Sequence, residues 1–357
     1  MINNKKVNPE ALQRSHFEQT AACIAERGIY LLIEDTTDVN LTRPNEVRGL
    51  GWTGNEKEKG LLVHSTLAVK LEHWSSEGEP ALNVIGLHDQ QVWTRKHKSR
   101  KKSETQWQRL KRPRESERWA QSIFASEGPP SWSQWIFVAD RESDIYEVLK
   151  GCTDRSISFV IRACSPRKID NQKIGLLQAA LQAPIMGQET LLIRARTGQA
   201  KRTANLTIRA RTITISAPKR PGGPGSPLTF NVVTAIEENP PVGVAGLQWV
   251  LLTGLRCKTM SDCQKALRIY ESRWLIEEYH KALKTGMGIE KTQLETAEAI
   301  RNLLGIIAIV AVRLLRLKLI GRCDPGQMIR PEDIPEEGIM LLEQRYGRPK
   351  EGWTCRQ

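Results

Sequence analysis

The hydrophobic pattern of the first half of the chain predicts short buried strands separated by helices. Residues 29–40 ("IYLLIEDTTDVN") begin as an apolar run and then turn to acid and hydroxyl side chains, as in a buried strand that leads into a loop. Similar apolar runs predict strands at 61–72, 81–93, 135–140 and 157–163. Helical spacing predicts helices at 115–126 and 141–151. Because strands and helices alternate, this half of the chain is expected to be α/β.

The second half of the chain has a different pattern of apolar and polar residues. From 165 to 248 apolar and polar residues alternate, and "PKRPGGPGSP" (218–227) interrupts them, which predicts an inserted antiparallel β region. After an apolar run at 247–254 the spacing predicts two long helices, at about 260–286 and 293–317. The expected organisation is a first part of the core (1–164), a β-rich insertion (165–248), a second part of the core (249–320) and a short C-terminal segment (321–357).

The stretch "YESRWLIEEYHKALKTG" (270–286) places a row of polar side chains on one side of the first of these helices. With 3.6 residues per turn, five residues project within an arc of about 80°: Tyr270, Arg273, Glu277, Lys281 and Lys284. The opposite side is apolar and can pack on a sheet. Ion pairs between residues four apart on a solvated face give the same pattern, so the row alone does not define a site. His280 is expected at the surface, with no chemical role.

Two of the apolar runs end in an aspartate, Asp35 in "IED" and Asp140 in "VAD". Reactive groups gather at the carboxyl ends of strands in α/β sheets, so these residues could lie side by side. An aspartate at this place is also a common N-cap or turn residue. Two adjacent carboxylates need a counter-charge, and Glu277 could complete a site for two Mg²⁺ or Mn²⁺ ions. Asp35, Asp140 and Glu277 are therefore the candidate catalytic residues and metal ligands.

The spacing of Tyr270, Arg273, Glu277 and Lys284 resembles the Y-R-E-K signature of a known family, the bacterial insertion-sequence transposases with a DDE catalytic triad. This group includes the transposon-five transposase. "DTTDVN" and "DRESDIYE" resemble the two aspartate motifs of the family, in the family's order, and the match extends from near residue 10 to about residue 317. The resemblance implies a ribonuclease-H-like catalytic core, a mixed sheet flanked by helices, with the β region inserted between the second Asp and the Glu.

The resemblance also implies DNA contacts. Trp249, in "QWVLLT", would stack on a base flipped out of the transposon end, and Tyr270 and Arg273 would hold the phosphate of that nucleotide. Lys281 and Lys284 would contact the end DNA near the cut. The alternative for Trp249 is an ordinary core tryptophan.

The segment "VIRACSPRK" resembles the family's R-x-x-x-P-R-K stretch, which makes Arg162 a candidate DNA contact. Its alternative role is that of a cation on an edge strand. The chain has 53 Lys+Arg against 40 Asp+Glu, a net charge of +13, which favours a polyanionic partner such as nucleic acid. The basic tract 94–114 could grip DNA or be a solvated loop.

The seven cysteines form no CxxC pair and read as reduced thiols, and no apolar run is long enough to span a bilayer. We therefore expect a cytoplasmic bacterial protein associated with the nucleoid and not with a membrane.

The mechanism that the resemblance implies is cut-and-paste transposition. Water cleaves one strand at the transposon end with metal assistance, and the freed 3' hydroxyl then forms a hairpin with the opposite strand. Water reopens the hairpin, and the 3' end finally attacks target DNA. The partners would be double-stranded DNA and a second transposase chain, as a homodimer or as a dimer with a full-length transposase in a synaptic complex.

Two departures from the family pattern suggest alternatives. Family members carry a recognition domain ahead of the first Asp, whereas Asp35 lies 34 residues from the start, and residues 321–357 are short where the family has a helical pairing region. A non-catalytic inhibitor that pairs with a full-length transposase, or an inert remnant, is therefore the second hypothesis. A structure-specific nuclease is the third, and it gives no role to Trp249 or to the Tyr270 row.

Overall fold

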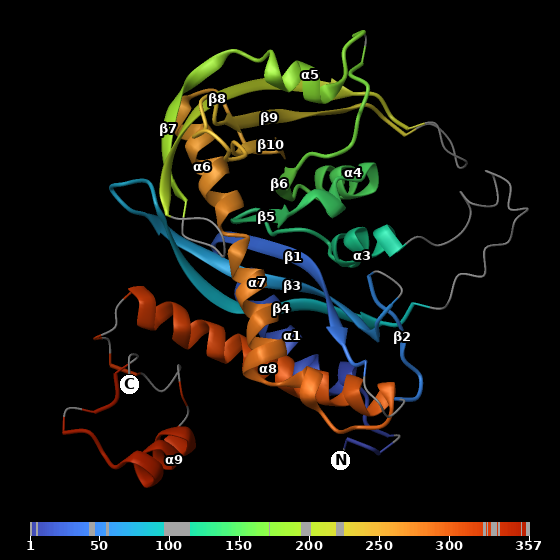
Figure 1. Cartoon of the computed structure of the whole chain (residues 1–357), viewed down its shortest axis with the longest axis vertical. Coiled ribbons are helices and arrows are strands. Elements are labelled where there is room, and N and C mark those ends of the chain that lie inside the picture. The colour runs from blue at the N-terminus through green and yellow to red at the C-terminus, as the bar shows by residue number, and fades with distance from the viewer. Residues whose placement is uncertain are drawn as a thin grey trace, which may run out of the picture.

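In the part of the chain that the structure describes, ten strands form one mixed β-sheet at the centre of the molecule (Figure 1). The structure is a computed structural model. It describes residues 2–4, 6–42, 47–54, 57–95, 115–170, 172–193, 201–218, 225–323, 326, 328–329, 334, 336–350 and 352–354. Most of the basic tract, residues 96–114, therefore lies outside the described residues.

Five strands form the part of the sheet that carries the candidate aspartates. In chain order they are β1 (Gly28–Asn40), β3 (Lys59–Trp74), β4 (Pro80–Trp93), β5 (Ser133–Ala139) and β6 (Ser158–Arg162). Their spatial order is β4-β3-β1-β5-β6: β3 is antiparallel to both neighbours, whereas β1, β5 and β6 run parallel. The two-residue strand β2 (Gly51–Trp52) pairs with the start of β3. This is the arrangement of a ribonuclease-H-like core, so the predicted fold class is confirmed.

The inserted region continues the same sheet. Its elements are α5 (Leu176–Leu181), β7 (Ile185–Ile193), β8 (Arg202–Ile215) and β9 (Leu228–Ile236), followed by β10 (Gln248–Thr253). The strands are antiparallel, and β10 joins β9 to β6. The β-rich insertion is thus antiparallel, as its alternating pattern predicts, and it lies beyond β6 in the sheet (Figure 1).

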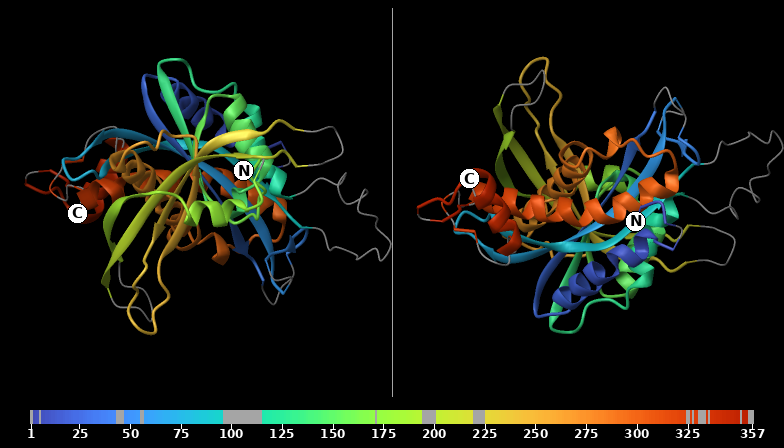
Figure 2. Two further views of the ribbon diagram at one scale, coloured as in Figure 1. Left: turned by 90° about the horizontal axis from the view of Figure 1, so that it is seen from above. Right: turned by 90° about the horizontal axis from the view of Figure 1, so that it is seen from below.

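Helices cover both faces of the sheet (Figure 2). Leu31 and Ile33 of β1 pack in a cluster with the helices that follow β10, whereas Tyr30 and Leu32 pack with those on the opposite face. The first set is α6 (Met260–Glu271), α7 (Trp274–Lys281) and α8 (Ala297–Cys323), and the second is α3 (Arg118–Ala125) and α4 (Tyr146–Asp154). Because side chains alternate along a strand, Asp35 faces α7 and its neighbour Glu34 faces α3.

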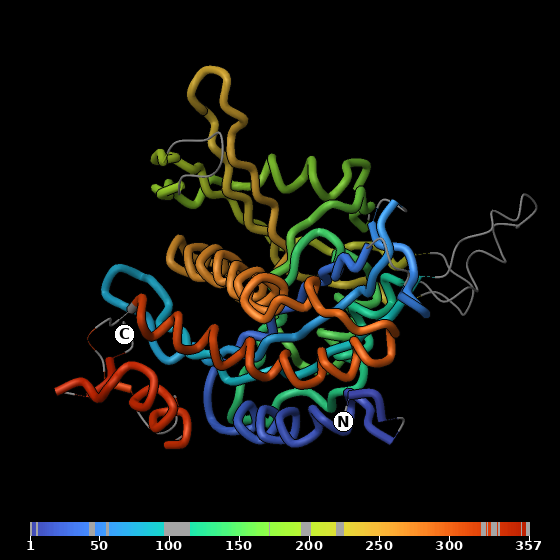
Figure 3. Tube along the Cα trace, turned by 60° about the horizontal axis from the view of Figure 1, so that its bottom comes forward, coloured from blue at the N-terminus to red at the C-terminus, as the bar shows by residue number. Residues whose placement is uncertain are grey.

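Three helices of the described residues, α1 (Pro9–Ile24), α5 and α9 (Glu336–Tyr346), have no counterpart among the predicted elements. Helix α1 lies beside α8 (Figure 3). Its start has a recognisable signal, since the Asn8 side chain accepts a hydrogen bond from the Ala11 amide and Pro9 occupies the first turn. Helix α9 lies near the C-terminus (Figure 1). The predicted helix 141–151 was also shifted: a 3₁₀ turn, η2 (Arg141–Ser143), precedes α4, which continues past Gly151 to Asp154.

The prediction of one helix over 260–286 was wrong. Helices α6 and α7 are separated at Ser272 and Arg273, where the Ser272 hydroxyl donates to the Arg268 carbonyl at 3.0 Å. Such a bond competes with the helical ladder and commonly bends a helix. The last turn, η3 (Ala282–Gly286), is a π-helix. A helical wheel drawn for one continuous α-helix therefore does not describe the directions of all its side chains.

Candidate active site and DNA interface

The sheet places Asp35 and Asp140 at equivalent positions on adjacent parallel strands. The parallel pairing of β1 with β5 ends with Ile33 opposite Val138, and each aspartate lies two residues further along its strand direction. Asp140 directly follows β5, as predicted, and its carboxylate accepts a hydrogen bond from the Glu142 amide at 2.9 Å. The two carboxylates therefore emerge at the same edge of the parallel strands.

Asp35 does not end its strand, contrary to the sequence-based expectation. β1 continues to Asn40 because β3 is long enough to pair with it over this whole stretch, with Ser65 opposite Asp35. The Thr36 amide donates to the Asp35 carboxylate at 2.8 Å. The polar residues after Asp35 thus belong to an antiparallel strand pair and not to a loop.

Helix α7 brings Glu277 to this edge. Its buried residue Tyr279 anchors the helix to the sheet, because the Gln90 side-chain amide on β4 donates to the tyrosine hydroxyl at 2.8 Å and to Ser65 at 3.1 Å. Ser65 is the cross-strand neighbour of Asp35. The position of Glu277 relative to Asp35 is therefore set by a buried hydrogen-bonded contact.

Arg273 connects the first and third candidate carboxylates. Its Nη1 lies 3.4 Å from Asp35 Oδ2, and its Nη2 donates to Glu277. The Arg273 side chain is 20% exposed, so this ion pairing is partly shielded from water. A guanidinium in this place offsets the repulsion between two converging carboxylates.

Asp140 and Glu277 both act electrostatically on Asp35. Burial raises the pKa of Asp35 to about 6, Arg273 opposes this, and Asp140 and Glu277 raise it further. The largest cause is burial, which disfavours the charged form, and the neighbouring carboxylates act in the same direction. Hard oxygen donors with excess negative charge fit Mg²⁺ or Mn²⁺, so the residues present suit a divalent cation. Among the described residues no three His, Cys, Asp or Glu side chains are grouped closely enough to hold one, and Arg273 lies between two of the candidates.

The candidate lysines lie on the C-terminal side of Glu277. Lys281 ends α7 and is exposed, whereas Lys284 lies in η3 with its Nζ 3.6 Å from Asp38 and 4.0 Å from Glu290. These are loose, partly exposed ion pairs, which contribute little to stability. Lys284 is thus close to the site, and exchange of these carboxylates for a phosphate would cost little.

Trp249 and Tyr270 contact each other at one side of the site. Their rings are 5.4 Å apart at an interplanar angle of 72°, an edge-to-face arrangement. Tyr270 is only 6% exposed and belongs to the core, yet it lies close enough to Arg273 to interact with it electrostatically. Arg162 donates to the Gln248 carbonyl at 3.0 Å, which places it next to Trp249. The DNA contacts of all three residues remain predictions.

His280 is buried, which contradicts its expected surface position. It is 5% exposed, burial lowers its pKa to about 3, and its Nε2 has no hydrogen-bond partner within the described residues. The buried side of α7 contains Leu275, Ile276 and Tyr279, as its apolar spacing predicts, and it also includes His280, whose ring contacts that of Tyr279. The imidazole is therefore neutral at neutral pH.

A buried polar chain behind Asp35 had no counterpart in the sequence-based prediction. Glu34 accepts a hydrogen bond from Ser122, and its other oxygen lies 3.2 Å from His64 Nε2. The opposite ring nitrogen of His64 lies 2.9 Å from the Thr36 hydroxyl, and the Thr36 amide holds Asp35. The signal in the sequence was a glutamate within an apolar run, which needs buried partners if the run is a core strand.

Comparison with known proteins identifies the class to which this site belongs. The family model described as the transposase DDE domain matches residues 129–313, just over half of the chain and including Asp140 and Glu277. The chain therefore belongs to the DDE transposase family, whose members act in DNA transposition and generally use divalent metal ions.

Among solved structures, the chain is similar to a piggyBac transposase in a synaptic complex with hairpin DNA, determined by cryo-EM. The sequence identity is 10% and the TM-score is 0.40, over 98% of this chain and 62% of that chain. The chain thus spans less than two thirds of that protein's length. The family assignment rests on the family model.

Two general expectations can be compared with the structure as well. Five of the cysteines are free thiols in the structure: Cys23, Cys152, Cys164, Cys257 and Cys263. Within the described residues, no helix combines the length and apolar character needed to span a membrane.

Proposed function

We propose that this chain is a DNA transposase that cleaves phosphodiester bonds at transposon ends and transfers the freed strand to target DNA. The observation that carries the proposal is that Asp35 on β1 and Glu277 on α7 share Arg273, while Asp140 after β5 lies close enough to Asp35 to act on it electrostatically. The membership of the chain in the DDE transposase family supports the same chemistry.

Asp35, Asp140 and Glu277 are the residues that would hold divalent cations, Mg²⁺ or Mn²⁺. Bound there, two ions would activate an attacking oxygen and stabilise the leaving oxygen of an in-line displacement. The chain itself contributes the orientation of the carboxylates: the sheet fixes the two aspartates, and Tyr279 fixes the helix that carries the glutamate. Arg273 would exchange its carboxylate partners for a phosphate when DNA enters the site.

The DNA side of the site is proposed from the residues around this centre. Lys281 and Lys284 would bind backbone phosphates near the cut. Trp249 offers an aromatic face for a flipped base, and Tyr270 supports that ring edge-on. A flipped base relieves the bend of a tight hairpin, so this arrangement favours the resemblance-based pathway through a hairpin intermediate.

The partners that we propose are the DNA of the transposon ends and of the target, with two transposase chains in one synaptic complex. Resemblance to the transposon-five group and a bacterial, nucleoid-associated setting belong to the same proposal. Arg162, beside Trp249 on the adjoining strand, would contact the end DNA in this complex.

The test is a nicking assay with the purified chain, Mg²⁺ or Mn²⁺, and duplexes that carry the inverted repeats flanking its gene. We expect a nick at the repeat boundary that requires metal and is abolished in Glu277→Gln. The matched control is Glu278→Gln, which changes the adjacent carboxylate on the same helix, where it pairs with Lys318. The control should nick as the wild type does.

Two results would contradict the proposal, one for the enzymatic activity of the chain and one for the assignment of its catalytic residues. If wild-type chain binds the duplex without nicking it and suppresses nicking by a full-length relative, the chain is a transposase inhibitor. Full activity of Glu277→Gln would instead show that the carboxylates are assigned wrongly.

A further inference from the structure

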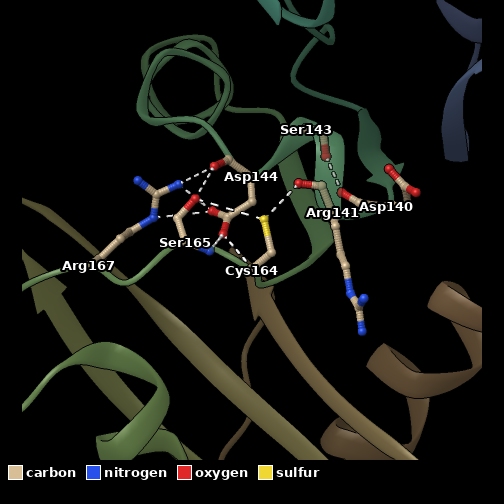
Figure 4. Close-up of polar contacts among 7 residues, drawn as sticks. All are labelled: Asp140, Arg141, Ser143, Asp144, Cys164, Ser165 and Arg167. Atoms are coloured by element: carbon tan, nitrogen blue, oxygen red, sulfur yellow. Dashed lines mark hydrogen bonds and ion pairs between the residues drawn. The ribbon is translucent and has the colours of Figure 1, made fainter. Parts of the chain in front are cut away.

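Asp144, four residues after Asp140 in the segment "DRESDIYE", is buried beside the candidate site. Both of its carboxylate oxygens accept hydrogen bonds (Figure 4). Its Oδ2 accepts hydrogen bonds from the amides of Cys164 and Ser165, both at 2.7 Å. Its Oδ1 accepts from Arg167 Nε at 3.2 Å and from Arg167 Nη2. Four charge-assisted bonds satisfy a buried carboxylate completely. We call Asp144, Cys164, Ser165 and Arg167 the Asp144 clamp.

The clamp joins the segments that follow two neighbouring strands. Asp144 lies after β5, and the other three residues lie after β6. Further bonds tighten the connection: the Ser165 hydroxyl and Arg167 Nη2 donate to the Asp144 carbonyl at 3.0 and 2.6 Å, and the Cys164 thiol donates to the Arg141 carbonyl at 3.1 Å (Figure 4). The two segments are therefore held together by main chain and side chain alike.

Further hydrogen bonds connect Asp144 to Asp140 through the turn 140–144. The Ser143 amide and hydroxyl donate to the Asp140 carbonyl at 3.3 and 2.8 Å, and the Asp144 amide donates to the Arg141 carbonyl at 3.2 Å. Ser143 is fully buried. One end of this turn is fixed by β5 and the other by the clamp, so the direction of the Asp140 carboxylate depends on both.

We propose that Asp144 is a positioning residue for Asp140, with Arg167 as its counter-charge. The clamp holds the turn 140–144 so that the Asp140 carboxylate faces Asp35 and can share a divalent cation with it; this inference rests on the proposed function. Arg167, although it lies in a basic stretch, is 14% exposed and committed to Asp144, so it is not a phosphate contact. A buried ion pair adds little stability compared with apolar side chains, and its main contribution here is orientation.

The molecule contains a matched control outside the site. Glu237 is buried in the inserted region, pairs with Arg202 through both carboxylate oxygens and accepts a hydrogen bond from the Leu247 amide at 3.0 Å. Glu237→Gln therefore removes the same kind of buried charge as Asp144→Asn, but far from Asp140 along the sheet order. Any effect common to both variants reflects folding alone.

The experiment measures Mn²⁺ binding to the full chain by electron paramagnetic resonance, with thermal unfolding of the same samples. Outer partners of metal ligands typically change affinity at least about tenfold, so we expect Asp144→Asn to weaken Mn²⁺ binding by that factor. Arg167→Gln should weaken it similarly, and the double variant should add nothing further. Glu237→Gln should lower the unfolding temperature and leave Mn²⁺ affinity unchanged.

Three results would overturn the inference in distinguishable ways. Unchanged Mn²⁺ affinity in a folded Asp144→Asn variant would leave the clamp a purely structural feature. If that variant does not fold, Arg167→Lys, which keeps the charge and loses the paired donors, must show the weakening instead, and unchanged affinity there overturns the inference. Unchanged affinity in Asp140→Ala would remove Asp140 as a ligand and overturn the proposed metal site as well.

Discussion

Single residues determine the charge balance of the candidate site, and Arg273 has the central place among them. Its guanidinium contacts Asp35 and Glu277, and it opposes the rise in the pKa of Asp35 that burial and, to a smaller extent, Asp140 and Glu277 cause. Arg273 pairs with two of the three candidate carboxylates, and a divalent cation bound there would supply further positive charge.

Replacement of Asp35 by Asn should stabilise the metal-free protein at high pH. The pKa of Asp35 is about 6 in the folded chain against 3.8 ordinarily, so the folded state binds more protons between these values and its stability falls as pH rises through this window. The variant should exceed the wild type at pH 8 by no more than about 3 kcal/mol and match it below pH 4. Urea unfolding with a chelator measures this; an equal difference at both pH values would contradict it.

His280 should change the pH dependence of folding stability in the opposite direction to Asp35, by lowering stability as the pH falls. Its pKa is lowered to about 3 from 6.5, so the unfolded chain binds the proton more readily, and stability falls as pH drops from 6.5 towards 3. His280→Leu removes this pH-dependent loss of stability and also removes a buried nitrogen that has no hydrogen-bond partner within the described residues. The variant should lose less stability than the wild type between pH 7 and pH 5 in urea titrations. A parallel loss in both proteins would show that His280 is not buried as described.

At the scale of elements, the site depends on how α7 packs on the sheet. Tyr279 is fully buried, and its hydroxyl accepts from Gln90, which also donates to Ser65 opposite Asp35. Tyr279→Phe leaves the packing intact and removes one acceptor, at a cost of about 1 kcal/mol in the free energy of unfolding. We also expect slower nicking at unchanged DNA affinity, since only the position of Glu277 is disturbed. A variant as active as the wild type would show that this hydrogen bond does not position the helix.

The end of α7 and the following π-turn carry Lys281 and Lys284, the lysines that we propose as DNA contacts. Removal of one phosphate contact, as in Lys281→Ala, should weaken binding to all DNA sequences and lower the slope of log K against log salt by about one unit. Lys318→Ala, which removes a lysine that pairs with Glu278, is the control and should keep the slope. Fluorescence anisotropy at several salt concentrations distinguishes the two outcomes.

Some helices and strands could be predicted from sequence patterns, and others could not. The strands β1, β3, β4, β5 and β6 could be predicted because each contains a short apolar run, the pattern of a buried strand, whereas the two-residue strand β2 was not predicted. The division of α6 from α7 depends on Ser272 bonding to Arg268, a tertiary choice that periodicity cannot reveal. The extension of β1 past Asp35 likewise depends on the length of its partner β3.

On the scale of the whole molecule, one sheet aligns the site and the inserted region. The order β4-β3-β1-β5-β6 brings Asp35 and Asp140 together, and β10 returns the chain so that α6 and α7 lie against the same face. The sequence was sufficient to predict this core and its three carboxylates as candidates. It could not predict Arg273 between two of them, the burial of Tyr270 and His280, or the Asp144 clamp, because these depend on contacts between distant segments.

The central claim is that Asp35, Asp140 and Glu277 form one catalytic unit. The direct measurement is the single-turnover rate of Mn²⁺-dependent nicking for each amide variant, Asp35→Asn, Asp140→Asn and Glu277→Gln, and for the triple variant. Residues that act as a unit are strongly non-additive, so each single change should lower the rate as far as the triple change does. Substantial activity in any single variant, with further loss in the triple, would contradict the account.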